Sequence, residues 1–100
     1  MLTKEQILRK IEENREEIKK YSVIKLGLFG SYIRKEQREK SDIDILVEFE
    51  KGGKTFDNYM DLKFFLEELF GHGVDLVISD TIKPRLKPYI MTEVEYAEGL

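Results

Sequence analysis

The chain has 100 residues, of which 41% are hydrophobic and 37% are charged, and its formal net charge is −3. This length predicts one domain over residues 1–100, and the acidic balance argues against direct binding of nucleic acid, which favours basic surfaces. The lack of cysteine excludes disulfides and thiolate metal sites and favours a reducing cytoplasm. No apolar run reaches membrane-spanning length, and residues 1–20 lack the apolar centre of a signal peptide. We therefore expect a cytoplasmic protein with no membrane contact.

The first predicted element is a helix over residues 4–20. Thr3 and Gln6 fit a capping box, in which each side chain binds the backbone N–H of the other residue. Isoleucines then recur at helical spacing among Glu, Lys and Arg, which gives the helix one apolar stripe. We assign this helix no role beyond covering the core.

A strand is predicted over residues 23–29. Side chains alternate between the two faces of a strand. The side chains expected on its core face are Ile24, Leu26 and Leu28. A turn and a short basic helix are expected in the polar stretch that follows, within residues 30–40.

Gly30 and Ser31 suit a phosphate-binding turn. A glycine before a helix start allows backbone N–H groups to approach a phosphate closely, and the helix dipole and the Ser31 hydroxyl add to the attraction. Arg34, three residues on, shares a helical face with Ser31 and could contact a phosphate oxygen. Taken singly these features are common, because most Gly-Ser pairs are plain turns and Arg34 also fits a solvated helix face.

A second strand, residues 42–50, begins with two acids. Asp42 and Asp44 fall on one face, and the apolar side chains that alternate with them fall on the other. Two carboxylates one pleat apart repel each other, and a divalent cation would relieve that repulsion and take both as oxygen ligands. An isolated Asp-x-Asp is most often a solvated strand edge. Next to a phosphate-binding turn, however, it provides what nucleotidyl transfer with magnesium requires.

A helix is expected from Thr55 or Asp57 to about Phe70, with Gly71 as its stop. It carries more large apolar side chains than one face can bury. The excess suits either a core on both flanks or an exposed surface for another subunit, and we favour a surface for a homodimer or hetero-oligomer. His72 lies between two glycines and is taken as an exposed turn residue.

The third predicted strand, residues 73–78, has Asp75 on the face opposite its apolar side chains. An Asp within an apolar strand is costly unless it is paired or binds a metal. If this strand lies beside the second one, Asp75 joins Asp42 and Asp44 on the open face of the sheet. The alternative is a surface Asp on an edge strand.

Pro84 and Pro88 exclude one regular helix through residues 82–91, because an interior proline loses a hydrogen bond and clashes with the preceding turn. We expect a short helical turn and then a last extended segment. The basic residues around these prolines suit a solvated turn, with steering of a triphosphate or binding of an acidic partner as alternatives.

Residues 28–50 resemble the signature of the DNA polymerase β-like nucleotidyltransferase superfamily: Gly-Ser, an Arg soon after, then Ser-Asp-x-Asp at the head of a strand. Within that superfamily the chain as a whole is similar to the minimal nucleotidyltransferase (MNT) proteins, the MntA-type antitoxins. The family carries a third carboxylate on a later strand, and Asp75 matches that position. The family often has Ala-Arg-Gly where this chain has Ile-Arg-Lys at positions 33–35, so Lys35 replaces a flexible glycine near the phosphates.

The resemblance implies transfer of AMP from ATP to a hydroxyl, with two Mg²⁺ ions. The carboxylates implied to be catalytic and metal-binding are Asp42, Asp44 and Asp75. The residues implied to bind the nucleotide are Gly30, Ser31, Arg34 and Ser41. For Ser41 there is an alternative, in which it only orients the start of the strand through local hydrogen bonds.

The resemblance also implies a partner, because MNT proteins are typically encoded beside a HEPN-domain toxin. A tyrosine of that toxin is the implied acceptor, and the chain would act as its antitoxin. The rival hypothesis is a binding-only antitoxin that blocks the toxin without catalysis. Transfer to a small molecule such as an aminoglycoside is a third option, against which the short chain argues.

The order of elements predicts an α/β (α+β) fold, with a small mixed β-sheet of three to four strands and helices packed on one face. Asp42 and Asp44 would then look onto the open face.

Overall fold

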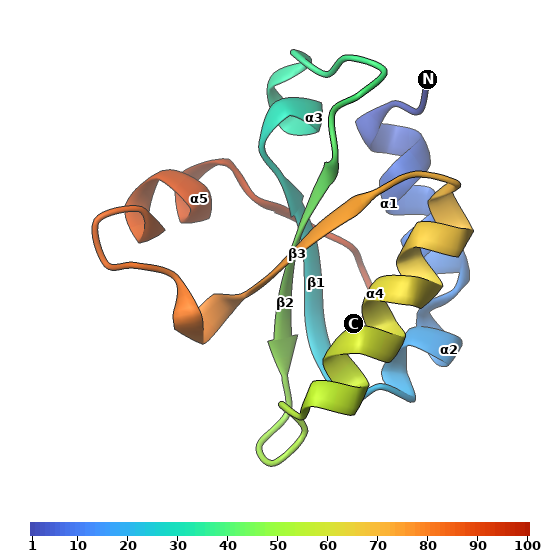
Figure 1. The fold of residues 1–100 in the computed structure, drawn as a ribbon, viewed down its shortest axis with the longest axis vertical. Coiled ribbons are helices and arrows are strands. Elements are labelled where there is room, and N and C mark those ends of the chain that lie inside the picture. The colour runs from blue at the N-terminus through green and yellow to red at the C-terminus, as the bar shows by residue number, and fades with distance from the viewer.

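In the computed structural model, which describes residues 1–100, a mixed sheet of four strands is flanked by helices (Figure 1). The strands are β1 (Val23–Phe29), β2 (Ile43–Phe49), β3 (Val74–Ile78) and β4 (Glu95–Tyr96). The helices are α1 (Lys4–Glu13), α2 (Arg15–Lys19), α3 (Ser31–Arg34), α4 (Phe56–Phe70) and α5 (Lys87–Glu93), with a 3₁₀ turn, η1, at Ser79–Thr81. No helix has the length and apolar character of a membrane span.

The strands lie in the order β3-β2-β1-β4. β1 is antiparallel to both β2 and β4, whereas β2 and β3 are parallel. A parallel pair needs a crossover connection, and α4 provides it between β2 and β3. This arrangement confirms the predicted α/β (α+β) class with a mixed sheet, and it places β3 beside β2 as the position of Asp75 required.

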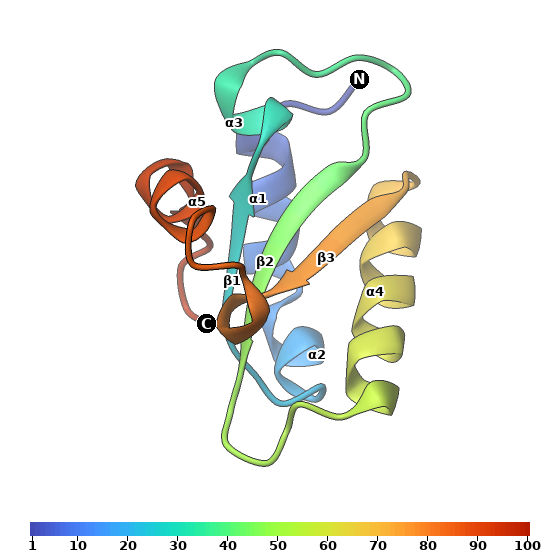
Figure 2. The ribbon, with the colours of Figure 1, turned by 60° about the vertical axis from the view of Figure 1, so that its left-hand side comes forward.

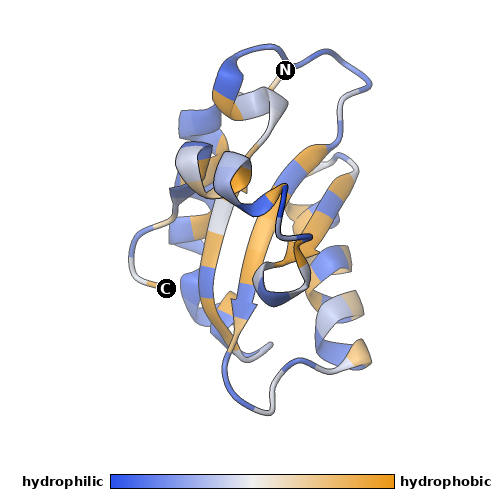
Figure 3. Cartoon of the chain, turned by 90° about the vertical axis from the view of Figure 1, so that its left-hand side faces the viewer, coloured by the Kyte–Doolittle hydropathy of each residue, from blue (hydrophilic) through white to orange (hydrophobic).

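Helices α1, α2 and α4 cover one face of the sheet, as predicted, and α5 lies on the other side (Figures 1 and 2). Hydrophobic residues gather in the strands, above all in β2 and β3 (Figure 3). The fully buried side chains of the main core are Ile7, Ile11, Ile18, Leu26, Leu28, Tyr32, Ile43, Ile45, Val47, Leu62 and Leu66. The face of the sheet away from this core, which carries Asp44 and Asp75, is called the open face below.

The open face has a small apolar contact of its own. Leu46 alternates with the core residues of β2, so it points to the open face, yet it is only 1% exposed and lies outside the main core cluster. The turn η1 packs against β2, and the chain from η1 to α5 crosses this side of the sheet (Figure 2). The open face is therefore partly covered by the segment that follows β3.

The single helix predicted over residues 4–20 is instead two helices that meet at Asn14. The capping box of Thr3 and Gln6 is present as predicted. Asn14 leaves the helical conformation, with φ −114° and ψ 17°, and its side-chain amide donates to the carbonyl oxygen of Lys10 at 2.7 Å. An Asn side chain competes with the helix for backbone hydrogen bonds, so the helix breaks at Asn14 although the periodic apolar pattern continues through it.

β1 has the predicted bounds, but the prediction that Ile24 faces the core is wrong. Ile24 is 41% exposed, and Val23 is buried in its place. The register with β2 slips between Val23 and Lys25, as in a β-bulge. An extra residue in one strand reverses the alternation on one side of the bulge.

The short basic helix is limited to α3, which ends where Lys35 adopts a left-handed conformation. α4 agrees with the prediction: the Thr55 hydroxyl accepts from the Asn58 N–H at 3.1 Å, and Gly71 ends the helix with φ 63°. α5 begins only at Lys87, with a proline in its first turn. The prolines therefore divide the region as predicted.

Candidate active site

Gly30 forms the turn between β1 and α3, with φ 77° and ψ −148°, a conformation that favours glycine. A Cβ at this position would run into the carboxylate of Asp44. The Gly30 carbonyl oxygen accepts from the N–H groups of Ile33 and Arg34, both at 3.1 Å, which closes the first turn of α3. Glycine is needed here for two reasons, its positive φ and its contact with Asp44.

Asp44 and Asp75 are paired at the same level of the parallel β2–β3 ladder. The pKa of Asp44 is raised from 3.8 to about 6. Burial is the largest cause, followed by the charges of Asp75 and Asp42 and a hydrogen bond with Asp75, while Arg34 acts in the opposite direction. Asp44 is thus held beside another acid in surroundings that disfavour its ionised form.

Asp42 lies just before β2 and is exposed, with its Oδ1 only 2.6 Å from where a Cβ on Gly73 would be. The charge of Asp42 contributes to the raised pKa of Asp44. In this conformation no three His, Cys, Asp or Glu side chains are arranged so that they could hold a metal ion. The donors nevertheless fit Mg²⁺, which prefers carboxylate oxygens. The pKa of Asp44 is raised by burial first and then by repulsion from Asp75 and Asp42, and a bound cation would relieve that repulsion.

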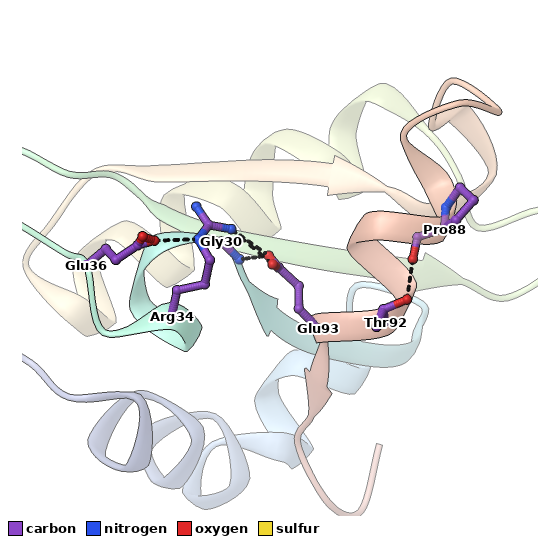
Figure 4. A network of polar contacts seen from close by, with 6 residues as sticks. All are labelled: Gly30, Arg34, Glu36, Pro88, Thr92 and Glu93. Atoms are coloured by element: carbon purple, nitrogen blue, oxygen red, sulfur yellow. Dashed lines mark hydrogen bonds and ion pairs between the residues drawn. The ribbon is translucent and has the colours of Figure 1, made fainter.

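Arg34 faces two carboxylates (Figure 4). Its Nε donates to Glu36 Oε1 at 2.8 Å, and its NH1 donates to Glu93 Oε1 at 3.0 Å. The hydrogen bonds to Glu36 and then Glu93 are the main reasons why its pKa is raised. Ser31, partly exposed, is the first residue of α3 and lies beside the same turn.

Glu93 is a site residue that sequence reasoning missed. Its Oε2 accepts from the Gly30 N–H at 2.5 Å while the same carboxylate accepts from Arg34 (Figure 4). Glu93 is 59 residues from Arg34 in the chain. No local pattern distinguishes it from the other glutamates, so only the path of the chain after β3 brings it to this turn.

Ser41 is engaged within the loop before β2. Its hydroxyl accepts from the Arg38 N–H at 2.9 Å, and the Tyr32 hydroxyl donates to its carbonyl oxygen at 3.5 Å. These contacts favour the local alternative, in which Ser41 orients the start of β2.

The prediction that His72 is an exposed turn residue is wrong. The ring is partly buried, with Nε2 2.9 Å from the Glu39 carbonyl oxygen and Nδ1 3.2 Å from that of Gly73. These two backbone contacts are the main causes that raise the pKa of His72. The flanking glycines do mark a turn, but this turn packs against the loop after α3. His72 therefore connects that loop to the start of β3.

The apolar excess of α4 divides between core and surface. Tyr59, Phe65 and Leu69 pack against the core. Phe56 and Phe64 are exposed. Each of the two predicted alternatives thus accounts for part of the excess, and the two exposed rings remain the candidate contact surface of this helix.

The nucleotidyltransferase domain family matches residues 8–97 of this chain. A protein of Thermococcus cleftensis, named protein adenylyltransferase MntA, is 37% identical over 97 residues, which cover 96% of this chain and 97% of the relative. A candidate protein adenylyltransferase of Methanocaldococcus jannaschii is 46% identical over 89 residues, 89% of this chain and 85% of the relative.

Solved structures share the fold. A candidate minimal nucleotidyltransferase gives a TM-score of 0.72 at 35% identity, covering 88% of this chain and 93% of that chain. A chain from the complex of a tri-AMPylated Shewanella oneidensis HEPN toxin with its MNT antitoxin gives 0.63 at 20% identity, covering 93% and 73%. At that lower identity the likeness shows the fold alone. The family match and the near full-length similarity to MntA show that this chain belongs to the nucleotidyltransferase family, in its minimal, MntA-like branch.

Proposed function

We propose that this nucleotidyltransferase transfers AMP from ATP to a protein hydroxyl in a Mg²⁺-dependent reaction. The proposed acceptor is a tyrosine of a HEPN-type toxin, which the protein neutralises as its antitoxin. One observation carries the proposal: the Gly30 turn lies against Asp44, which is itself paired with Asp75. An anion-binding turn next to an acidic cation site is the arrangement that nucleotidyl transfer needs.

The similar proteins support the donor and the partner. The T. cleftensis relative is named a protein adenylyltransferase. One structure of the same fold is a toxin–antitoxin with AMP-PNP, and another holds an AMPylated HEPN toxin with an MNT antitoxin. These descriptions favour ATP as the donor and a HEPN protein as the acceptor.

In this proposal Gly30, Ser31 and Arg34 bind the phosphates that leave. The first N–H groups of a helix have no partner within the helix and can donate to an anion. The Ser31 hydroxyl adds a donor, and the Arg34 guanidinium adds a charge with fixed donor geometry. Together these groups would hold the pyrophosphate portion of ATP at the start of α3.

Asp42, Asp44 and Asp75 would hold the Mg²⁺ ions. When bound, Mg²⁺ neutralises triphosphate charge and lowers the pKa of the attacking hydroxyl. Because Asp44 has a pKa of about 6 without the cation, its ionisation would be coupled to Mg²⁺ binding, and affinity should rise with pH through that range.

The proposed reaction forms one bond and breaks one. The acceptor oxygen attacks the α-phosphorus of ATP, the bond from that phosphorus to the bridging oxygen breaks, and pyrophosphate leaves. Asp75 is exposed on the open face, so it is accessible to take the proton of the acceptor hydroxyl. The product is a phosphodiester between AMP and the acceptor.

The test is incubation of the purified protein with α-labelled ATP and Mg²⁺, with and without the product of the neighbouring gene, which the proposal expects to be a HEPN-type protein. We expect label on that protein, and none with the double variant Asp42→Asn/Asp44→Asn. Asp61→Asn, an exposed acid on α4 far from the turn in sequence, is the matched control and should label normally.

The rival, a binding-only antitoxin, makes a different prediction for the same variants. If Asp42→Asn/Asp44→Asn still neutralises the toxin and still forms a stable complex without label, binding alone is the function. Loss of neutralisation together with loss of label would establish catalysis as the route.

A further inference from the structure

The carboxylate of Glu93 lies on the groups that the proposed function assigns to phosphate. One oxygen accepts from the Gly30 N–H at 2.5 Å, and Arg34 NH1 lies 3.0 and 3.2 Å from the two oxygens (Figure 4). A carboxylate bound by a backbone N–H at a helix start and by a guanidinium is bound as a phosphate would be. Glu93 thus supplies an internal anion to this turn.

Glu93 is delivered by residues 79–93, which we call the strap. The start of the strap is held, since η1 packs against β2 and Lys54 Nζ binds Asp80 Oδ2 at 3.0 Å, whereas α5 at its other end is loosely packed. No residue of α5 is buried, and only Ile90 and Glu93 in that helix are even partly covered. The Thr92 hydroxyl donates to the Pro88 carbonyl oxygen, and the Ile90 N–H donates to that of Leu86. These bonds lie within the strap and do not attach it to the sheet. The hydrogen bonds between α5 and the start of α3 all come from Glu93, and α5 has no buried residue, so breaking them exposes little apolar surface.

The Gly30 N–H and the Arg34 fork cannot serve Glu93 and a phosphate at the same time. Arg34 is also bound by Glu36, so in this conformation two carboxylates oppose its single positive charge. An incoming triphosphate would meet donors already used and a local excess of negative charge. It can bind there only after Glu93 has left.

We infer that Glu93 is a built-in competitor of the nucleotide phosphates, and that the strap must release Gly30 and Arg34 before the site can be loaded. The inference rests on the proposed function in taking these two residues as the phosphate grip. Apparent affinity is then the intrinsic affinity multiplied by the fraction of molecules with the strap released. Any partner that holds the strap away would raise nucleotide affinity without touching the nucleotide.

The first test measures binding of inorganic pyrophosphate by titration calorimetry to the full chain and to Glu93→Gln. Gln keeps the size of the side chain and removes its charge, and we expect the Kd to fall by about tenfold if the strap is closed in roughly nine molecules of ten. Glu98→Gln makes the same charge change on an exposed residue outside the strap and should leave the Kd unchanged. An unchanged or weaker affinity of Glu93→Gln would overturn the inference and make Glu93 a positioning residue for Arg34.

The second test needs no variant. Backbone amide exchange of residues 87–93 should become faster when wild-type protein is saturated with pyrophosphate, because the released helix loses the hydrogen bonds of Glu93 to Gly30 and Arg34. Unchanged protection with pyrophosphate bound would overturn the inference. Both readouts are independent of AMP transfer. If the protein shows both effects but transfers no AMP, the inference about the strap stands and the proposed function fails. If the protein transfers AMP and shows neither effect, the proposed function stands and the inference about the strap fails.

Discussion

Two regions supply the candidate active site, and they are built in opposite ways. β2 and β3 carry Asp44 and Asp75 on strands whose other face is buried in the main core. The strap carries Glu93 on a helix with no buried residue. Packing fixes side chains on a rigid element, whereas segments with few buried groups open locally at small cost. The acids therefore belong to the scaffold, and Glu93 belongs to a part that can move.

The largest expected contrast comes from truncating one apolar side chain in each region. Ile45→Ala removes a fully buried side chain of β2 and should cost about 2–5 kcal/mol of unfolding free energy. Tyr89→Ala removes a ring of α5 that is 75% exposed and should stay within about 0.5 kcal/mol. Urea denaturation measures both. A large loss for Tyr89→Ala would show that the strap is part of the core.

Gly30→Ala tests the contact between the turn and the scaffold. The added Cβ meets the Asp44 carboxylate at a residue with φ 77°, so we expect a loss of about 2–4 kcal/mol and weaker ATP binding. Gly52→Ala is the matched control, since Gly52 has φ 82° and nothing near its Cβ. It should lose about 1–2 kcal/mol through conformation alone. Equal losses would mean that the approach to Asp44 is unimportant.

Asp44→Asn tests how much the Asp44 carboxylate destabilises the scaffold. The free energy of unfolding of the variant and of wild type is measured by urea denaturation as a function of pH, in buffer without Mg²⁺. The pKa of Asp44 is about 6 in the folded state against 3.8 as the ordinary value, so between these values the folded state binds more protons and stability falls as pH rises. The destabilisation by the ionised Asp44 carboxylate is absent below the unfolded-state pKa of 3.8 and complete above the folded-state pKa of about 6. We expect the variant to be more stable than wild type by about 1–2 kcal/mol above pH 7. The difference should disappear below about pH 4.

That outcome separates two readings of Asp44. A stability difference that did not depend on pH would show that the gain comes from packing rather than from removing a carboxylate. Loss of AMP transfer at every pH, with stability gained, would be the pattern of a functional residue held at the expense of stability.

The smallest effect is expected at Lys35, which has φ 59° and ψ 35° at the end of α3. Lys35→Gly relieves a left-handed conformation and should stabilise the chain by about 0.5–1 kcal/mol, less the larger unfolded-state entropy of glycine. Lys40→Gly, at a residue without positive φ, should instead be slightly destabilising. Thermal denaturation compares the two. A loss at both positions would indicate that the strain at Lys35 is negligible.

The outcome of sequence-based prediction follows the same division between scaffold and strap. Alternation assigned the apolar side chains of β2, Ile45 among them, to one face and Asp44 and Asp75 to the opposite face of their strands, because the period is set by the buried face. That Asp75 lies beside Asp44 depended on β3 lying beside β2, which the structure shows. Glu93 could not be found in this way. Its position depends on where a loosely packed segment returns to the sheet, and no local pattern encodes that return.

Smaller misses have local causes of the same kind. Val23 replaces Ile24 in the core because of a bulge, and a bulge leaves no trace in the apolar pattern of one strand. Asn14 breaks a helix whose apolar stripe continues through it. The left-handed conformation of Lys35, in contrast, agrees with the glycine that the family resemblance implies at this position, because glycine adopts a positive φ without strain.

The narrow attachment of β4 has a consequence for how the chain folds. β4 pairs with β1 only at Gly27↔Tyr96 and Leu28↔Glu95, and the Ala97 N–H adds one bond to β1 at 2.9 Å. These pairings join segments roughly seventy residues apart and consist of few hydrogen bonds, so they are expected to form late in folding. β4 is nevertheless tied to the scaffold, since Ala97 is buried in the main core and Lys4 Nζ binds Glu95 Oε2 at 2.9 Å. The residues between β3 and β4, none of which is buried, should therefore open locally as one unit while the sheet, with all three aspartates, stays folded.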